Sequence, residues 1–182
     1  MSADALTPVV LSAESLAAHP SLTLFQKVLL TTDGTVTELL GLYTGEAIKA
    51  RKLSQSLAAG LGASHLDAPA DAPVLHRTIM LCGRRTGRDL LFAESFFVFG
   101  HFPQAVQDGL LHTEQPIGLL WREARLEMYR EIVDRRIERN PDTSAHFGLP
   151  PETDILSRTY TIAHGGRPLG VITEKFPAHL LR

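Results

Sequence analysis

The chain has 182 residues, 44% of them hydrophobic, which is enough to bury one sizeable core, so we expect a single domain. Its formal net charge of -2 at pH 7 argues against nucleic-acid binding, which requires a basic surplus. A single cysteine excludes a disulfide framework, and the eight histidines lack metal-binding spacing, so we expect no metal. No apolar run reaches the ~18–20 residues of a membrane span, and the N-terminus lacks signal-peptide features, which together predict a soluble cytoplasmic protein.

The N-terminal residues are predicted to be less ordered than the rest. Residues 1–20 are small, polar and rich in alanine, and we expect a partly mobile segment there, with the domain spanning 21–182. Apolar residues at helical spacing predict a short helix over 21–30.

Two runs that follow the Asp33-Gly34 turn signal resemble the strands of a hairpin. Apolar residues alternate over 35–43, and a second run covers 46–54, although a helix over 46–57 is also compatible with the sequence. The segment 58–73 is rich in Ala, Gly, Asp and Pro and is predicted to be a loop.

The clearest strands are 74–82 and 89–99, which flank a polar, glycine-containing turn. Side chains alternate faces along a strand, so Arg77 shares a face with aliphatic residues. These are Leu75, Ile79 and Leu81. Arg77 is therefore a guanidinium placed in an apolar row.

Two helices are predicted next. One covers 102–111, and a longer amphipathic helix covers 115–140, with Pro116 suited to its first turn. The second helix could be broken into two at Gly118 or near Arg122.

The C-terminal segment 157–177 has two alternating runs around a Gly165-Gly166 link, the pattern of a β-hairpin. In its second run, Glu174 shares a face with Ile172 and Phe176, and a buried carboxylate requires a partner. The element order predicts an α+β fold with an antiparallel sheet and helices gathered on one side.

Arg77 and Glu174 are open to two interpretations. They could form a buried structural salt bridge, or they could line a ligand pocket, where Arg77 binds a carboxylate and Glu174 contacts a hydroxyl or moves a proton. Glu94 could instead pair with Arg77 across the hairpin. His76 adjoins Arg77 but faces the other way, and Ser95 lacks the surroundings of a nucleophile.

Four blocks, in this order and spacing, resemble the chorismate lyases (chorismate–pyruvate lyases) from about Leu24 to Pro177. They are DGTVTELL, VLHRTIMLCG, QPIGLLW and SRTYTIAHGGRPLGVITEKFP. The last is the most specific, because it combines the turn, the Thr-Glu pair and the following aromatic residue.

The resemblance implies a buried pocket between the sheet and helical lids. It implies that Arg77 binds the ring carboxylate of the ligand and that Glu174 contacts its ring hydroxyl, both as catalytic residues. Further substrate-binding residues implied or expected are Thr35, Val36, Ser95, Ile117 and Gly118.

The central strand differs from the ubiquinone-pathway branch of this family, which has a second arginine there. The Ala93-Glu94-Ser95 sequence of this chain is nearer a branch that includes enzymes making 4-hydroxybenzoate for phenolic lipids. The group that binds the pyruvyl carboxylate is therefore open. The candidates are Lys49, Lys52, His76, Arg84 and Arg85.

The implied reaction converts chorismate to 4-hydroxybenzoate and pyruvate without metal or organic cofactor, and the expected partners are this substrate and its aromatic product. The alternatives are a lyase for a chorismate-like isomer and a non-catalytic aromatic-acid sensor, because the same fold serves as the effector domain of bacterial transcription regulators. The stretch before Leu24 is too short for the winged-helix domain of such regulators. The oligomeric state is left open.

Overall fold

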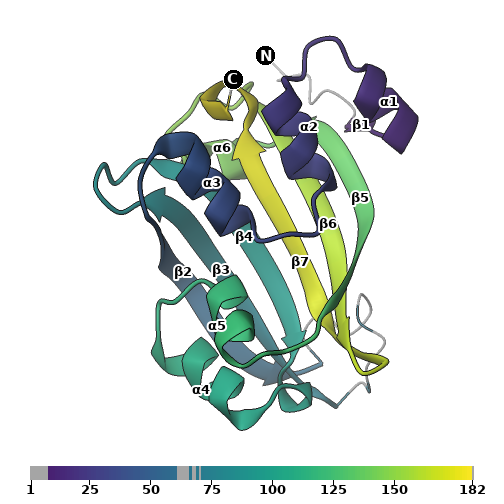
Figure 1. Cartoon of the computed structure of the whole chain (residues 1–182), viewed down its shortest axis with the longest axis vertical. Helices are drawn as coiled ribbons and strands as arrows, with labels where there is room; N and C mark the ends of the chain where they lie inside the picture. The colour runs from purple at the N-terminus through teal and green to yellow at the C-terminus, as the bar shows by residue number, and fades with distance from the viewer. Residues whose placement is uncertain (1–7, 61–65, 67–68, 70, 182) are drawn as a thin grey trace.

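The centre of the molecule is a seven-stranded antiparallel sheet (Figure 1). The computed structural model describes residues 8–60, 66, 69 and 71–181. The strand order is β1-β5-β6-β7-β4-β3-β2, and every pairing is antiparallel. The strands are β1 (Val9–Val10), β2 (Ile48–Ala59), β3 (Pro73–Gly83), β4 (Asp89–Val98), β5 (Tyr129–Arg139), β6 (Asp154–His164) and β7 (Arg167–Pro177).

Most of the helices cover one face of this sheet. The helices are α1 (Ala13–Ala18), α2 (Leu24–Thr31), α3 (Val36–Thr44), α4 (Gln104–His112), α5 (Ile117–Glu123) and α6 (Pro141–His146), with 3-10 turns η2 (Phe99–His101) and η3 (Ala178–Leu181). Helices α2, α3, α4 and α5 lie over the inner face, whereas α6 lies behind the sheet, where His146 stacks on Phe92 (Figure 1). None of the helices in the described part of the chain is long and apolar enough to span a membrane.

The inner face is packed by two apolar clusters. One joins α2 and α3 to the sheet through Leu30, Leu40 and Leu91, and the other joins α4 and α5 to it through residues such as Leu110 and Trp121. The expected α+β fold, with an antiparallel sheet and helices enclosing a pocket, is confirmed.

Local sequence explains where several elements begin and end. Thr23 and Gln26 form a capping box at the start of α2. The β6–β7 turn has positive φ angles at both Gly165 (55°) and Gly166 (75°), as a two-residue hairpin turn requires. The predicted hairpin 157–177 is confirmed as β6 and β7, and the predicted strands 74–82 and 89–99 are confirmed as β3 and β4, although Phe99 belongs to η2.

The predicted helices 21–30 and 102–111 correspond to α2 and α4 and are confirmed. Within the expected mobile segment 1–20, residues 8–20 include β1 and α1, whereas residues 1–7 lie outside the described part. The predicted loop 58–73 overlaps the ends of β2 and β3, and part of it also lies outside the described residues.

The predicted hairpin between 35–43 and 46–54 is wrong, because the first run forms helix α3. Val36 and Leu40 are buried four residues apart, a spacing that suits one face of a helix as well as one face of a strand. The helix ends at Gly45, whose φ of 67° is a left-handed C-terminal cap. The second run is a strand, but β2 pairs with β3.

The predicted helix 115–140 is wrong beyond residue 123. Helix α5 ends at Glu123, and Arg125 has a φ of 49° that interrupts the helical backbone. From Tyr129 the chain forms β5, which pairs with β6 along its length and bulges between Ile132 and Asp134. The hydrogen bonds of this ladder outweigh the helical spacing of the apolar residues.

Candidate active site

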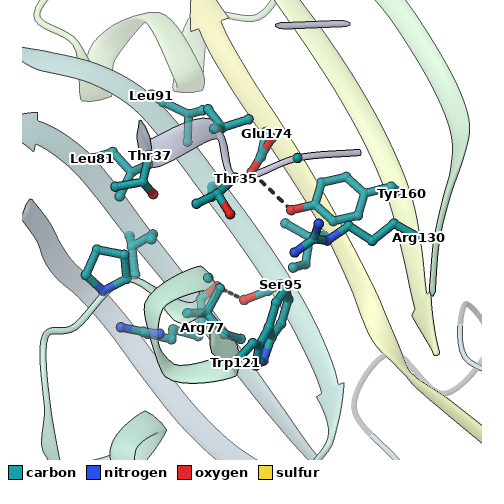
Figure 2. Close-up of a pocket in the computed structure, with 18 of the residues that line it drawn as sticks. Thr35, Thr37, Arg77, Leu81, Leu91, Ser95, Trp121, Arg130, Tyr160 and Glu174 are labelled. Carbon is teal, nitrogen blue, oxygen red and sulfur yellow. Dashed lines mark hydrogen bonds between the residues drawn. The ribbon is translucent and has the colours of Figure 1, made fainter. Parts of the chain in front are cut away.

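A pocket lies on the inner face of the sheet, beneath α5 and the start of α3, where the two apolar clusters meet (Figure 2). It contains about 600 Å³ of space between atoms, part of it open to solvent. Its apolar lining includes Ile79, Leu81, Leu91, Ala93, Phe97, Trp121 and Ile172. Among the described residues that line it, the charged ones are Arg77, Arg130 and Glu174.

Arg77 is a buried cation that forms no ion pair with any described residue. It lies on β3 opposite Ser95 of β4, and only 2% of its surface is exposed. Within the part of the chain that the structure describes, its Nε and Nη2 atoms have no hydrogen-bond partner. Burial lowers the pKa of Arg77 below the ordinary arginine value, and attraction from Glu114 opposes that effect. Arginine remains protonated in proteins, so the pocket contains an unpaired guanidinium that favours an anion.

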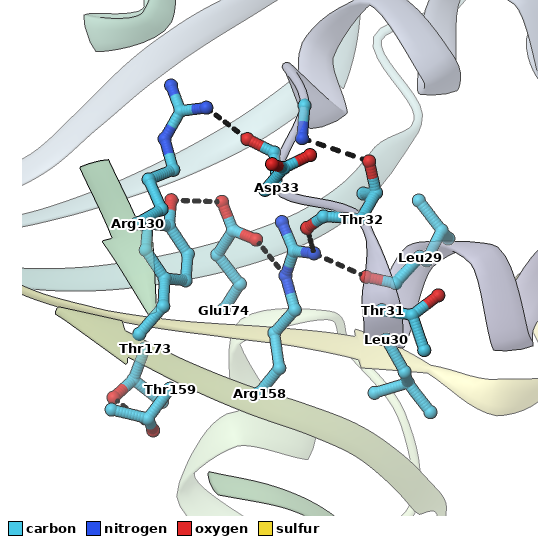
Figure 3. A network of polar contacts seen from close by, with 12 residues as sticks. Leu29, Leu30, Thr31, Thr32, Asp33, Arg130, Arg158, Thr159, Thr173 and Glu174 are labelled. Atoms are coloured by element: carbon cyan, nitrogen blue, oxygen red, sulfur yellow. Dashed lines mark hydrogen bonds and ion pairs between the residues drawn. The ribbon is translucent and has the colours of Figure 1, made fainter. Parts of the chain in front are cut away.

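Glu174, in contrast, accepts one hydrogen bond at each carboxylate oxygen from neighbours on β6 (Figure 3). Arg158 lies directly opposite it in the sheet, and its Nε donates to Glu174 Oε2 at 2.7 Å. The Tyr160 hydroxyl donates to Oε1 at 3.1 Å. The pKa of Tyr160 is raised well above its ordinary value, first by burial and then by the Glu174 charge, so the hydroxyl remains a donor.

Arg158 also fixes the segment between α2 and α3. Its Nη1 donates to the carbonyl oxygens of Leu29 and Thr32, each at 2.6 Å. Arg158 is itself buried, and its guanidinium lies 5.2 Å from the centre of the Tyr160 ring. The Glu174 carboxylate is thereby tied to the backbone that leads into the pocket wall at Thr35.

The structure answers the question of partners left open by the sequence. The salt bridge of Glu174 is with Arg158, so a direct Arg77–Glu174 pair is wrong. Glu94 lies on the opposite face and contacts His76 at 2.8 Å, so its pairing with Arg77 is also wrong. Arg77 and Glu174 instead line the same pocket.

The other sequence-predicted substrate-binding residues also line this pocket. They are Thr35, Val36, Ser95, Ile117 and Gly118. Ser95 Oγ donates to the Arg77 carbonyl oxygen at 3.2 Å. Helix α5 approaches Thr35 closely at Gly118, where an added Cβ would lie 3.1 Å from Thr35 Cγ2.

Sequence reasoning missed Arg130, Arg158 and Tyr160. Arg158 and Tyr160 lie in an apolar row of β6 between Leu156 and Ile162, the same pattern that singled out Glu174. Arg130 falls within the predicted helix 115–140, whereas in the structure it lies on strand β5 and lines the pocket.

The basic residues proposed for the second carboxylate lie elsewhere. His76 is on the outer face, and Lys49 and Arg84 line a separate cleft beside β2. Lys52 is nearer, since its pKa is lowered first by burial and then by the Arg77 charge, but its Nζ donates to the carbonyl oxygen of Leu111 at 3.3 Å. The backbone amide of Arg85 is bound by Glu46 in the β3–β4 turn.

The donor set of the site also bears on metal binding. Among the residues described, no group of three or more His, Cys, Asp or Glu side chains could bind a metal ion.

Solved structures with a similar fold include PhnF and the ligand-binding domain of a putative transcriptional regulator. PhnF from Mycobacterium smegmatis aligns with a TM-score of 0.63 at 16% identity, covering 84% of this chain and 67% of that chain. The ligand-binding domain of a putative GntR-family transcriptional regulator from Bordetella bronchiseptica aligns with a TM-score of 0.55 at 18% identity, covering 71% and 84%. These likenesses define the class of fold.

Sequence comparison is more specific. The model of the Rv2949c-like chorismate pyruvate-lyases matches residues 30–182. The chorismate pyruvate-lyase of Mycobacterium leprae is 30% identical over 162 residues, covering 82% of this chain and 72% of that protein. That of Mycobacterium tuberculosis H37Rv is 28% identical over 110 residues, covering 60% and 55%. The chain belongs to the Rv2949c-like chorismate pyruvate-lyase family, as its sequence motifs predict.

Proposed function

We propose that this chain converts chorismate to 4-hydroxybenzoate and pyruvate, with Arg77 binding the ring carboxylate and Glu174 contacting the ring hydroxyl. The observation that supports these roles best is Arg77, a buried cation whose Nε and Nη2 have no hydrogen-bond partner among the described residues. A carboxylate can accept two parallel hydrogen bonds from a guanidinium in a bidentate pair, and would thus provide acceptors for the Arg77 donors. The surrounding apolar walls suit an aromatic ring.

The reaction requires little chemistry from the protein. The bond between the ring carbon and the ether oxygen breaks, its electron pair leaves with the enolpyruvyl oxygen, and the carbon that bears the hydroxyl loses its proton. The new ring double bond completes an aromatic ring, and the proton balance is restored when enolpyruvate becomes pyruvate. Because aromatisation makes the step strongly downhill, positioning of the substrate is the main task.

Glu174 suits the role of acceptor in this reaction. Arg158 and Tyr160 each donate to one of its oxygens, which fixes the orientation of the carboxylate in the pocket wall. A carboxylate has about four lone-pair sites, so both oxygens retain capacity for the ring hydroxyl or for the departing ring proton.

The Ala93-Glu94-Ser95 sequence of β4 supports a place in the family branch that has this central-strand motif. Ser95 supports the role of Arg77, because its hydroxyl donates to the Arg77 carbonyl oxygen in the pocket wall. Cys82 is a buried free thiol and the single cysteine of the chain, which is compatible with the reducing cytoplasm.

The direct test is incubation of the pure protein with chorismate, followed by chromatography for 4-hydroxybenzoate and an independent assay for pyruvate. Equal amounts of both products are expected. Arg77→Ala should reduce turnover by at least about a hundredfold in a folded protein, and Glu174→Gln should lower kcat. Absence of product with tight binding of 4-hydroxybenzoate would overturn the lyase and indicate a sensor of aromatic acids.

A further inference from the structure

Arg130 is a second guanidinium in the pocket, on the side opposite Arg77 (Figure 2). It lies on β5 and Arg77 on β3, with β6, β7 and β4 between them in the sheet. The two side chains therefore enter the pocket from opposite sides, and Trp121 and Ser95 lie between them (Figure 2).

The Arg130 guanidinium is oriented by two neighbours. Its Nη1 donates to the carbonyl oxygen of Asp33, and its carbon Cζ lies 5.3 Å from the centre of the Trp121 ring. A guanidinium has five N–H donors, so the bond to Asp33 leaves donors for a ligand. Arg130 lies beside Tyr160, on the Glu174 side of the pocket (Figure 2).

We propose that Arg130 binds the carboxylate of the enolpyruvyl group. This inference rests on the proposed function, because it assigns the second charge of a dianionic substrate whose ring carboxylate is bound by Arg77. Among the described residues that line the pocket, Arg77 and Arg130 are the cations, and the third charge, Glu174, repels carboxylates. Arg130 thereby takes the place of the five residues that the sequence suggested for binding the pyruvyl carboxylate, namely Lys49, Lys52, His76, Arg84 and Arg85.

The two arginines differ in access to solvent, and that difference has a consequence for product release. Arg77 is 2% exposed, whereas Arg130 is partly exposed and donates to Asp33, which precedes the lining residue Gly34 and forms the rim of the pocket. Once the ether bond breaks, the pyruvyl carboxylate on Arg130 is nearer to solvent than the benzoate on Arg77. Pyruvate therefore leaves first, and 4-hydroxybenzoate remains as the slowly released product.

The test uses the fact that 4-hydroxybenzoate lacks the second carboxylate. Arg130→Gln retains an N–H donor for Asp33 but removes the charge. We expect KM for chorismate to rise about tenfold or more, while Kd for 4-hydroxybenzoate, measured by calorimetry, changes less than about twofold. The control is Arg122→Gln, which removes an exposed arginine that pairs with Glu38 outside the pocket, and it should leave both constants unchanged.

Three outcomes would overturn the assignment. An equal loss of affinity for chorismate and 4-hydroxybenzoate in Arg130→Gln would show that Arg130 acts by fixing the rim. An unchanged KM would remove it from the site, and a similar rise in KM in Arg122→Gln would make the effect non-specific.

Failure of the lyase reaction itself is distinguishable from failure of this assignment. If the wild-type protein yields no product, chorismate binding is measured by calorimetry in place of KM. A loss of chorismate affinity confined to Arg130→Gln would then support Arg130 and refute turnover alone, and equal affinities in variant and wild type would overturn Arg130.

Discussion

Arg158 pairs with Glu174 across the β6–β7 ladder, with 2.7 Å between Arg158 Nε and Glu174 Oε2. This pair neutralises the buried carboxylate within the protein. Arg77, which the sequence offered as the partner, consequently has no acidic partner of its own within hydrogen-bonding distance among the described residues. Arg158 thus has its partner within the protein, whereas Arg77 is available to a ligand.

The buried pair predicts strong coupling between its two members. Arg158→Met leaves the Glu174 carboxylate buried without a counter-ion, and Glu174→Leu does the same to Arg158. Each single change should lower the free energy of unfolding by about 3–5 kcal/mol. The double variant should lose much less than the sum, as measured by urea unfolding at pH 7. Additive losses would show that the two charges do not interact.

The raised pKa of Tyr160 predicts that the wild type loses more stability at alkaline pH than a variant without this hydroxyl. Its pKa is raised in the folded protein by burial and by Glu174, so the folded state retains the phenolic proton at a pH where the unfolded chain has lost it. The stabilisation is fully present below the unfolded pKa of about 10 and is lost as the pH rises through the folded pKa. Unfolding free energy should therefore fall more steeply above pH ~10 in the wild type than in Tyr160→Phe. Parallel curves for the two proteins would contradict the shift.

The central strands and the final hairpin were predictable from sequence because alternation and turn residues agree there. The helix over 35–43 was not, since a spacing of four residues between Val36 and Leu40 fits either structure. Strand β5 was not predictable because its apolar residues also fit helical spacing, and its pairing with β6 depends on residues between 15 positions (Arg139 and Asp154) and 34 positions (Tyr129 and Ala163) later in the chain.

The same contrast applies to the site. Arg77 and Glu174 were found because each is a charge in an apolar strand face, and family motifs supplied their expected roles. Arg158 shows the same pattern, in the row with Leu156 and Tyr160, and could have been found by it. Arg130 could not, because its place in the pocket follows from the strand order, which no local pattern encodes.

The contact between Gly118 and Thr35 predicts a reciprocal pair of substitutions. Gly118→Ala would place a Cβ 3.1 Å from Thr35 Cγ2, so α5 must shift at the pocket wall. Affinity for 4-hydroxybenzoate should fall severalfold while Tm is maintained, because alanine favours a helix over glycine by about 1 kcal/mol. Thr35→Ser removes the opposing methyl group and should restore affinity in the double variant. Calorimetry on the four proteins measures this, and lack of rescue would contradict the steric explanation.

The claim that Arg77 is an unpaired charge available to the ligand is tested most directly by thermal unfolding of Arg77→Met with and without 4-hydroxybenzoate. Methionine replaces a buried cation by an apolar side chain, so the ligand-free variant should unfold at a higher temperature than the wild type, by about 2–4 °C per kcal/mol gained. Added 4-hydroxybenzoate should raise the Tm of the wild type and leave that of the variant unchanged. A variant that unfolds at a lower temperature and is still stabilised by 4-hydroxybenzoate would contradict the account.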